Sequence, residues 1–198
     1  MAEWAVEFID LLWGAGDNQR MQNVKFRQVL IVALGLTCAL SACTPTLNWR
    51  DIRPADSAAS MLFPCKPDRF TRSVVLGGER VQMALNSCAA GDVIYAVSHA
   101  ELSDAAHVNS AVQAMHTAAA SNLGGSATVV SPLLVPGITP NSLSQRWAVN
   151  GQRADGNAVE QQFTVFSGGL KVYQISVIGQ KLDPAATDTF FGSLKLTP

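Results

Sequence analysis

The sequence predicts an α+β fold, with an antiparallel sheet of five to seven strands and one long and one short helix packed on it. Strand-like runs separated by Gly-Gly and Asp-Gly turns predict the sheet. An alanine-rich run over residues 103–122 predicts the long helix, and Asp183-Pro184 starts the short one. A chain of 198 residues with 15% charged side chains is typical of a single exported globular domain.

The first hairpin is predicted with its register. Gly77-Gly78 separates two strand-like runs, and a two-residue turn there places Val74 opposite Val81. Apolar and polar side chains then alternate between two faces, which predicts that the apolar face belongs to the core. This predicted core face comprises Phe70, Val74, Leu76, Val81, Met83 and Leu85.

The remaining elements follow from local signals. A third strand is predicted over residues 93–100, and the long helix buries a stripe that begins at Val108. Pro132 confines a strand over residues 128–135 to an edge. A meander follows over residues 145–151, 158–166 and 170–178, and its last strand is apolar on both faces, which favours a central position or a packed edge. The short helix ends near Gly192, Phe190 and Phe191 anchor it, and residues 193–196 are extended.

The segment Leu40-Ser41-Ala42-Cys43 resembles the lipobox of bacterial lipoproteins. A basic stretch and an uncharged apolar run precede it, which is the layout of a secretory signal. The resemblance implies that residues 21–42 are a signal peptide and that Cys43 carries the lipid. Thr44 stands where an aspartate is the usual inner-membrane retention signal, so the resemblance implies an outer-membrane lipoprotein that faces the periplasm. An uncleaved signal anchor is the alternative, although the run is short for a membrane span.

The chain around this signal is divided as follows. Residues 1–20 are acidic and precede Met21, so we interpret them as a non-native or mis-assigned extension, with a short amphipathic helix as the alternative. Residues 43–60 are interpreted as a tether, and residues 61–198 as one periplasmic domain. Residues 49–53 interrupt the tether; they lie at the lipid headgroups, fold against the domain, or act as spacer.

The two cysteines outside the signal and the lipobox predict a disulfide. The hairpin register makes Cys65 and Cys88 diagonal neighbours about 7–8 Å apart at Cα, slightly too far for a bond unless the chain bends. Pro64 and Pro67 can supply the bend. In an oxidising periplasm, we expect these two cysteines to pair.

Few residues in the sequence suggest catalysis, metal binding or ligand binding. We interpret His99, His107 and His116 as solvated or capping residues, and predict no cofactor and no metal site. Arg146, Trp147 and Arg153 are the candidate binding residues, for a glycan or a peptide strand, although a tryptophan in a strand is more often part of the core. The positive and negative side chains after residue 42 balance, which argues against nucleic acid as a partner.

Both ends of the domain resemble small exported domains of PsbP-like fold. The resemblance rests on residues 62–67 (LFPCKP) and 190–196 (FFGSLKL), and Cys65 stands where glycine is frequent in such domains. It implies a binding or assembly factor and supplies no catalytic residues.

These observations lead to a first hypothesis: a lipid-anchored, non-catalytic binding or scaffold domain for an envelope protein partner. The alternative is a periplasmic hydrolase acting on cell-envelope material, with a site assembled from dispersed residues such as His99, Arg146 and Asp155. A purely structural role in spacing the envelope is a third hypothesis. A pocket that gathers two or more of these polar residues would favour the enzyme.

Overall fold

A computed structural model describes residues 47–152 and 156–197. The predictions for the extension 1–20, the signal peptide 21–42 and the lipidated Cys43 lie outside these residues, as do Arg153 and Asp155. None of the helices in the described part of the chain is long and apolar enough to cross a membrane.

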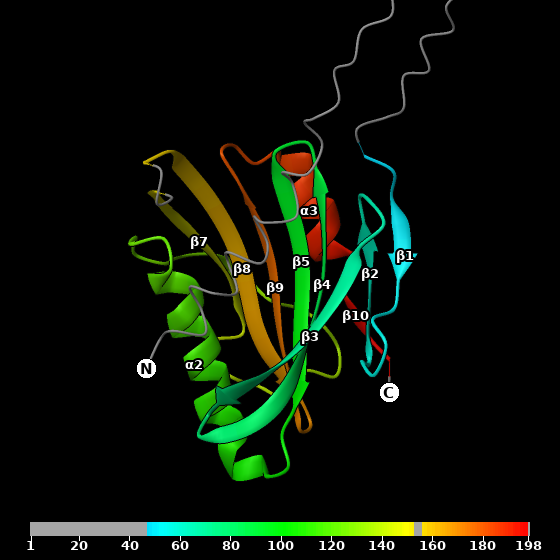
Figure 1. Cartoon of the computed structure of the whole chain (residues 1–198), viewed down its shortest axis with the longest axis vertical. Helices are drawn as coiled ribbons and strands as arrows, with labels where there is room; N and C mark the ends of the chain where they lie inside the picture. The colour runs from blue at the N-terminus through cyan, green and yellow to red at the C-terminus, as the bar shows by residue number, and fades with distance from the viewer. Residues whose placement is uncertain (1–46, 153–155, 198) are drawn as a thin grey trace, which may run out of the picture.

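The main sheet is antiparallel, as predicted, and its seven strands are the upper end of the predicted range of five to seven (Figure 1). Their spatial order is β3-β4-β5-β9-β8-β7-β6. In chain order they are β3 (Asp68–Leu76), β4 (Glu79–Ala90), β5 (Val93–Glu101), β6 (Thr128–Pro132), β7 (Gln145–Gln152), β8 (Ala158–Gly168) and β9 (Lys171–Gly179). The predicted edge strand is β6, and the strand that is apolar on both faces, β9, is the central one.

The β3–β4 hairpin has the predicted register, since Val74 pairs with Val81 and Phe70 with Leu85. Five of the six predicted core residues of this hairpin are buried, but Phe70 is exposed, so its assignment to the core was wrong. The physical reason is that β3 is an edge strand whose first half is exposed, while burial begins at Val74.

One face of the sheet is covered by the long helix α2 (Val108–Ser121), which follows a short 3₁₀ turn, η2 (Ala105–His107). The Asp104 carboxylate accepts a hydrogen bond from the Ala106 backbone N–H, as expected of a cap. The helix start lies very close to the hairpin turn: a Cβ added at Gly77 would lie 2.7 Å from the His107 carbonyl oxygen. The predicted stripe is buried, namely Val108, Ala111, Val112, Met115, Ala118 and Ala119.

A second layer covers the opposite face, and the sequence did not predict its sheet. It consists of α3 (Pro184–Gly192) and a small antiparallel sheet, β1-β2-β10, formed by β1 (Arg50–Ile52), β2 (Ala59–Phe63) and β10 (Lys195–Leu196). The Asp183 carboxylate caps α3 as predicted. Because β1 and the first two residues of β2 fall within residues 43–60, the tether has to be corrected: the folded domain begins before residue 61.

Aromatic packing explains why this segment folds. Phe63 of β2 and Tyr95 of β5 each lie 5.1 Å, centroid to centroid, from the Phe190 ring, in edge-on contacts. Trp49 contacts Tyr95 edge-on at 6.5 Å. Residues 49–52 therefore fold against the domain, which is one of the three interpretations the sequence left open. The small side chain of Ala59 is buried in the same cluster.

A disulfide joins Cys65 and Cys88, as predicted. Their Cα atoms are 5.9 Å apart, closer than the diagonal spacing of a regular ladder. Cys65 lies in the bend between β2 and β3, outside the strand register, which allows this approach. The bond ties the second layer to the main sheet.

Removing this bond should destabilise the domain by about 3 kcal/mol, because it closes a loop with a sequence separation of 23 residues. Urea unfolding of a Cys65→Ala/Cys88→Ala variant measures the loss. A reductant should lower the stability of the wild type to that of the variant and leave the variant unchanged. Equal stability of the oxidised wild type and the variant would contradict the assignment.

Candidate functional site

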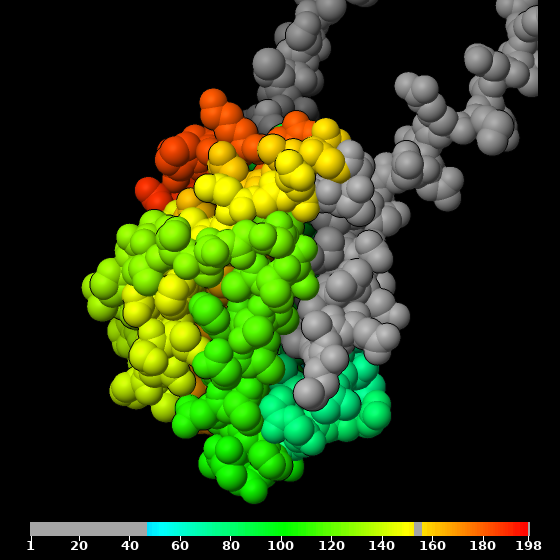
Figure 2. Space-filling model, turned by 90° about the vertical axis from the view of Figure 1, so that its left-hand side faces the viewer, coloured from blue at the N-terminus to red at the C-terminus, as the bar shows by residue number. Residues whose placement is uncertain are grey.

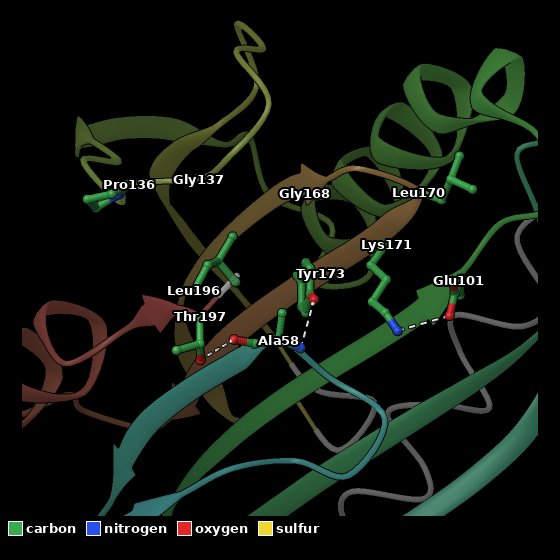
Figure 3. Close-up of a pocket in the computed structure, with 10 residues that line it drawn as sticks. All are labelled: Ala58, Glu101, Pro136, Gly137, Gly168, Leu170, Lys171, Tyr173, Leu196 and Thr197. Atoms are coloured by element: carbon green, nitrogen blue, oxygen red, sulfur yellow. Dashed lines mark hydrogen bonds and ion pairs between the residues drawn. The ribbon is translucent and has the colours of Figure 1, made fainter.

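The candidate site is a pocket of about 660 Å³ on the side of the second layer (Figure 3). It lies where β5 ends and β9 begins, next to the loop after β6 and the end of β10. Figure 3 shows Leu196 and Pro136 on one side of the pocket and Leu170 and Lys171 on the other. The lining residues are Ala58, Glu101, Pro136, Gly137, Gly168, Leu170, Lys171, Tyr173, Leu196 and Thr197.

The pocket is mainly apolar, and its charges are paired. Lys171 Nζ lies 2.9 Å from Glu101 Oε2 and donates a hydrogen bond to the Asp56 carbonyl oxygen at 3.0 Å. The register of β5 and β9 brings Lys171 and Glu101 together, because the two residues face each other across the ladder. A mutually neutralised pair at the wall provides little attraction for a charged ligand.

Ala58 lines the pocket at the end of the segment that links β1 and β2, residues 53–58. The Ala58 N–H donates to the Tyr173 hydroxyl at 3.3 Å, and the Thr197 N–H donates to the Ala58 carbonyl oxygen at 2.8 Å. Asp56, which has a positive φ of 62°, forms an ion pair of 2.9 Å with Arg69 of β3. The segment is thus attached at both ends and in the middle.

Glycines allow close packing around Leu196. A Cβ on Gly168 would lie 3.2 Å from Leu196 Cδ1, and one on Gly137 would lie 3.7 Å from Leu196 Cβ. The Thr139 N–H donates to the Ser167 carbonyl oxygen at 2.7 Å, which fixes the loop against β8. The wall is therefore well packed around Leu196.

His99 lies beside Tyr173, on the neighbouring strand, and is not one of the residues that line the pocket. It pairs with Tyr173 across the ladder, and the two rings stack at 6.1 Å. Its side chain is buried, and Nδ1 has no hydrogen-bond partner in the described structure. Burial, aided by the positive charge of Lys171, lowers the pKa of His99, while a hydrogen bond with the Ala55 backbone opposes this shift.

Of the candidate binding residues, Arg146 and Trp147 do not form a common site. Arg146 Nε donates to Gln162 at 2.6 Å, Arg146 Nη1 donates to Asp188 at 2.6 Å, and the guanidinium carbon lies 4.6 Å from the centre of the Phe191 ring. Arg146 therefore joins β7 and β8 to α3. Trp147 packs against the core beneath α2. Arg153 lies outside the described residues.

The other histidines also have local roles. His107 Nδ1 lies 3.3 Å from a Glu79 carboxylate oxygen at the start of α2. His116 packs edge-on against Trp147 at 4.6 Å, and burial lowers its pKa. Within residues 47–152 and 156–197, no three His, Cys, Asp or Glu side chains are grouped so that they could hold a metal ion.

Among the described residues, the structure does not bring together His99 and Arg146, two of the residues named for the dispersed hydrolase site. His99 lies on β5 and Arg146 on β7, with β9 and β8 between them, and Asp155 is outside the described residues. Sequence reasoning missed the pocket, whose lining comes from five separate segments of the chain. The one available signal was the run LLVPGITP over residues 133–140, which is unusually apolar for a surface loop.

The buried histidines predict acid sensitivity. Because the pKa of His99 is lower in the folded protein than in the unfolded chain, the unfolded chain takes up its proton first as the pH falls. Stability is therefore highest above the unfolded value near 6.5 and declines as the pH falls toward the folded value. Urea unfolding from pH 7 to pH 5 should show that His99→Gln has a shallower decline than the wild type, by at most about 1.4 kcal/mol per pH unit. Parallel slopes would contradict this.

We compared the chain with known proteins. No protein-family model matches it, and no match was found among the curated proteins or the solved structures. The resemblances to bacterial lipoproteins and to PsbP-like domains therefore stay predictions. The functional argument rests on the site itself.

Proposed function

We propose that this protein is a lipid-anchored lipoprotein of the outer membrane, with a non-catalytic domain that holds an apolar group of an envelope partner in the pocket at Leu170 and Leu196. The observation that carries the proposal is the composition of the pocket: most of its lining is apolar, and its two charged residues, Lys171 and Glu101, neutralise each other. Such a site binds by burial of apolar surface, at about 25 cal/mol per Å².

The place of the pocket in the fold supports this function. Arg50 pairs with Phe63 at one end of the small sheet, and the Asn48 N–H donates to the Pro64 carbonyl oxygen at the same end. Ala58, which lines the pocket, lies beyond the opposite end of β2, about 17 Å away. An anchor at Cys43 would reach the domain at the first end, so the pocket would lie at the end of β2 far from that attachment.

The anchor makes a direct prediction. After expression in a Gram-negative host, the membrane-bound protein should have the mass of residues 43–198 plus acyl groups, and reduction of the disulfide should add two hydrogens. Cys43→Ser should lack the acyl groups and lose membrane attachment, while Cys38→Ser is the matched control and should behave like the wild type. An unmodified chain that begins at residue 1 or 21 would overturn the localisation.

The pocket makes a second prediction. A neutral naphthylamine dye, which fluoresces in apolar surroundings, should bind the membrane-extracted protein after exchange into a detergent that does not bind the dye. Leu170→Asp should weaken dye binding about tenfold, because it places a charge against the apolar wall. The matched control is Val75→Asp, at a half-exposed valine of β3 outside the pocket lining, which should bind like the wild type. Equal dye binding by both variants would contradict the proposed site.

A further inference from the structure

A second surface, which adjoins the pocket at Pro136 and Gly137, is defined by the absence of charged side chains. Residues 105–145 contain no aspartate, glutamate, lysine or arginine, although such residues make up 15% of the chain. This run forms η2, α2, β6 and the loop over residues 133–144. In Figure 2, the green and yellow-green atoms of this run cover a large part of the side that faces the viewer. We call this surface the uncharged face.

The uncharged face carries both an apolar projection and an apolar hollow. Leu134 is 88% exposed, and Val129 and Val130 of the adjoining β6 are about half exposed. Leu134 itself borders an open hollow of about 520 Å³, whose other lining residues are mainly apolar residues of the same loop. These are Leu133, Val135, Pro136, Ile138 and Pro140.

We infer that the uncharged face binds a second copy of this chain across a two-fold axis, with Leu134 of each copy in the hollow of the other. A two-fold interface uses the same patch on both copies, so the patch must supply both the projection and the hollow, as this one does. Two uncharged faces meet without like-charge repulsion and without burying an unpaired charge. Depletion of charge is also the compositional mark of interface cores.

The edge strand explains why side chains, rather than strand pairing, make this contact. β6 shifts register between Val129 and Ser131, and Pro132 lacks a backbone N–H. Both features disfavour addition of a further strand to the sheet. A two-fold contact through Leu134 joins two copies and is then complete, whereas strand pairing at the edge could add further copies.

The test is the mass of the full chain, extracted from membranes into density-matched detergent and measured by sedimentation equilibrium. The wild type should have twice the mass of one chain at micromolar concentration. Leu134→Asp should raise the dissociation constant at least about tenfold, and because Leu134 is so exposed, its fold and melting temperature should be unchanged. Val75→Asp, at the opposite edge of the sheet, is the matched control and should remain dimeric.

A second measurement uses intact membranes. A short bis-maleimide should join two copies of a Leu134→Cys variant and should not join copies of Val75→Cys or of the parent chain. Three outcomes would each overturn the second-copy assignment. The wild type would have the mass of a single chain, Leu134→Asp would remain as dimeric as the wild type, or position 134 would be cross-linked only to a different protein or to lipid. The dye and anchor experiments test the proposed function separately, since neither uses Leu134.

Discussion

The structure depends on one constraint: the central strand β9 is apolar on both faces, so both faces must be covered. Val172 and Ile178 face the core beneath α2, whereas Tyr173, Ile175 and Val177 face the second layer. A fully buried side chain of this size contributes about 1.5–3 kcal/mol, and exposure of either face would forfeit several such contributions. The small sheet is therefore part of the core even though its strands have only three, five and two residues.

Elements that depend on local signals were predictable. The register of the first hairpin follows from its two glycines, Asp104 caps the 3₁₀ turn that leads into α2, and Asp183 caps α3. The second layer was not predictable in this way, because its pairings are remote, as with Ala59 and Leu196. Small residues such as Ala59 are typical of a flexible tether, but they also fit against an aromatic cluster. Composition alone therefore could not distinguish a tether from a packed strand.

The candidate site was missed for a related reason. Arg146 and Trp147 are adjacent in sequence, but the pleat of a strand directs successive side chains to opposite faces, so the two contact different cores. The pocket, by contrast, gathers residues from Ala58 to Thr197 that share no sequence pattern. The charged wall of the pocket is formed by Glu101 and Lys171, which pair across the ladder. This pairing can be predicted only if β5 is already known to lie next to β9.

The loop after β6 connects the two surfaces on which our proposals rest. Leu133, Val135 and Ile138 pack against the core of the second layer, while Leu134 between them points outward. Pro136 lines both the pocket and the hollow of the uncharged face. Because the Thr139 N–H holds the loop to β8, the shape of both recesses is set by the same main-sheet strand. Any change that displaces the loop at Pro136 must therefore alter both surfaces together.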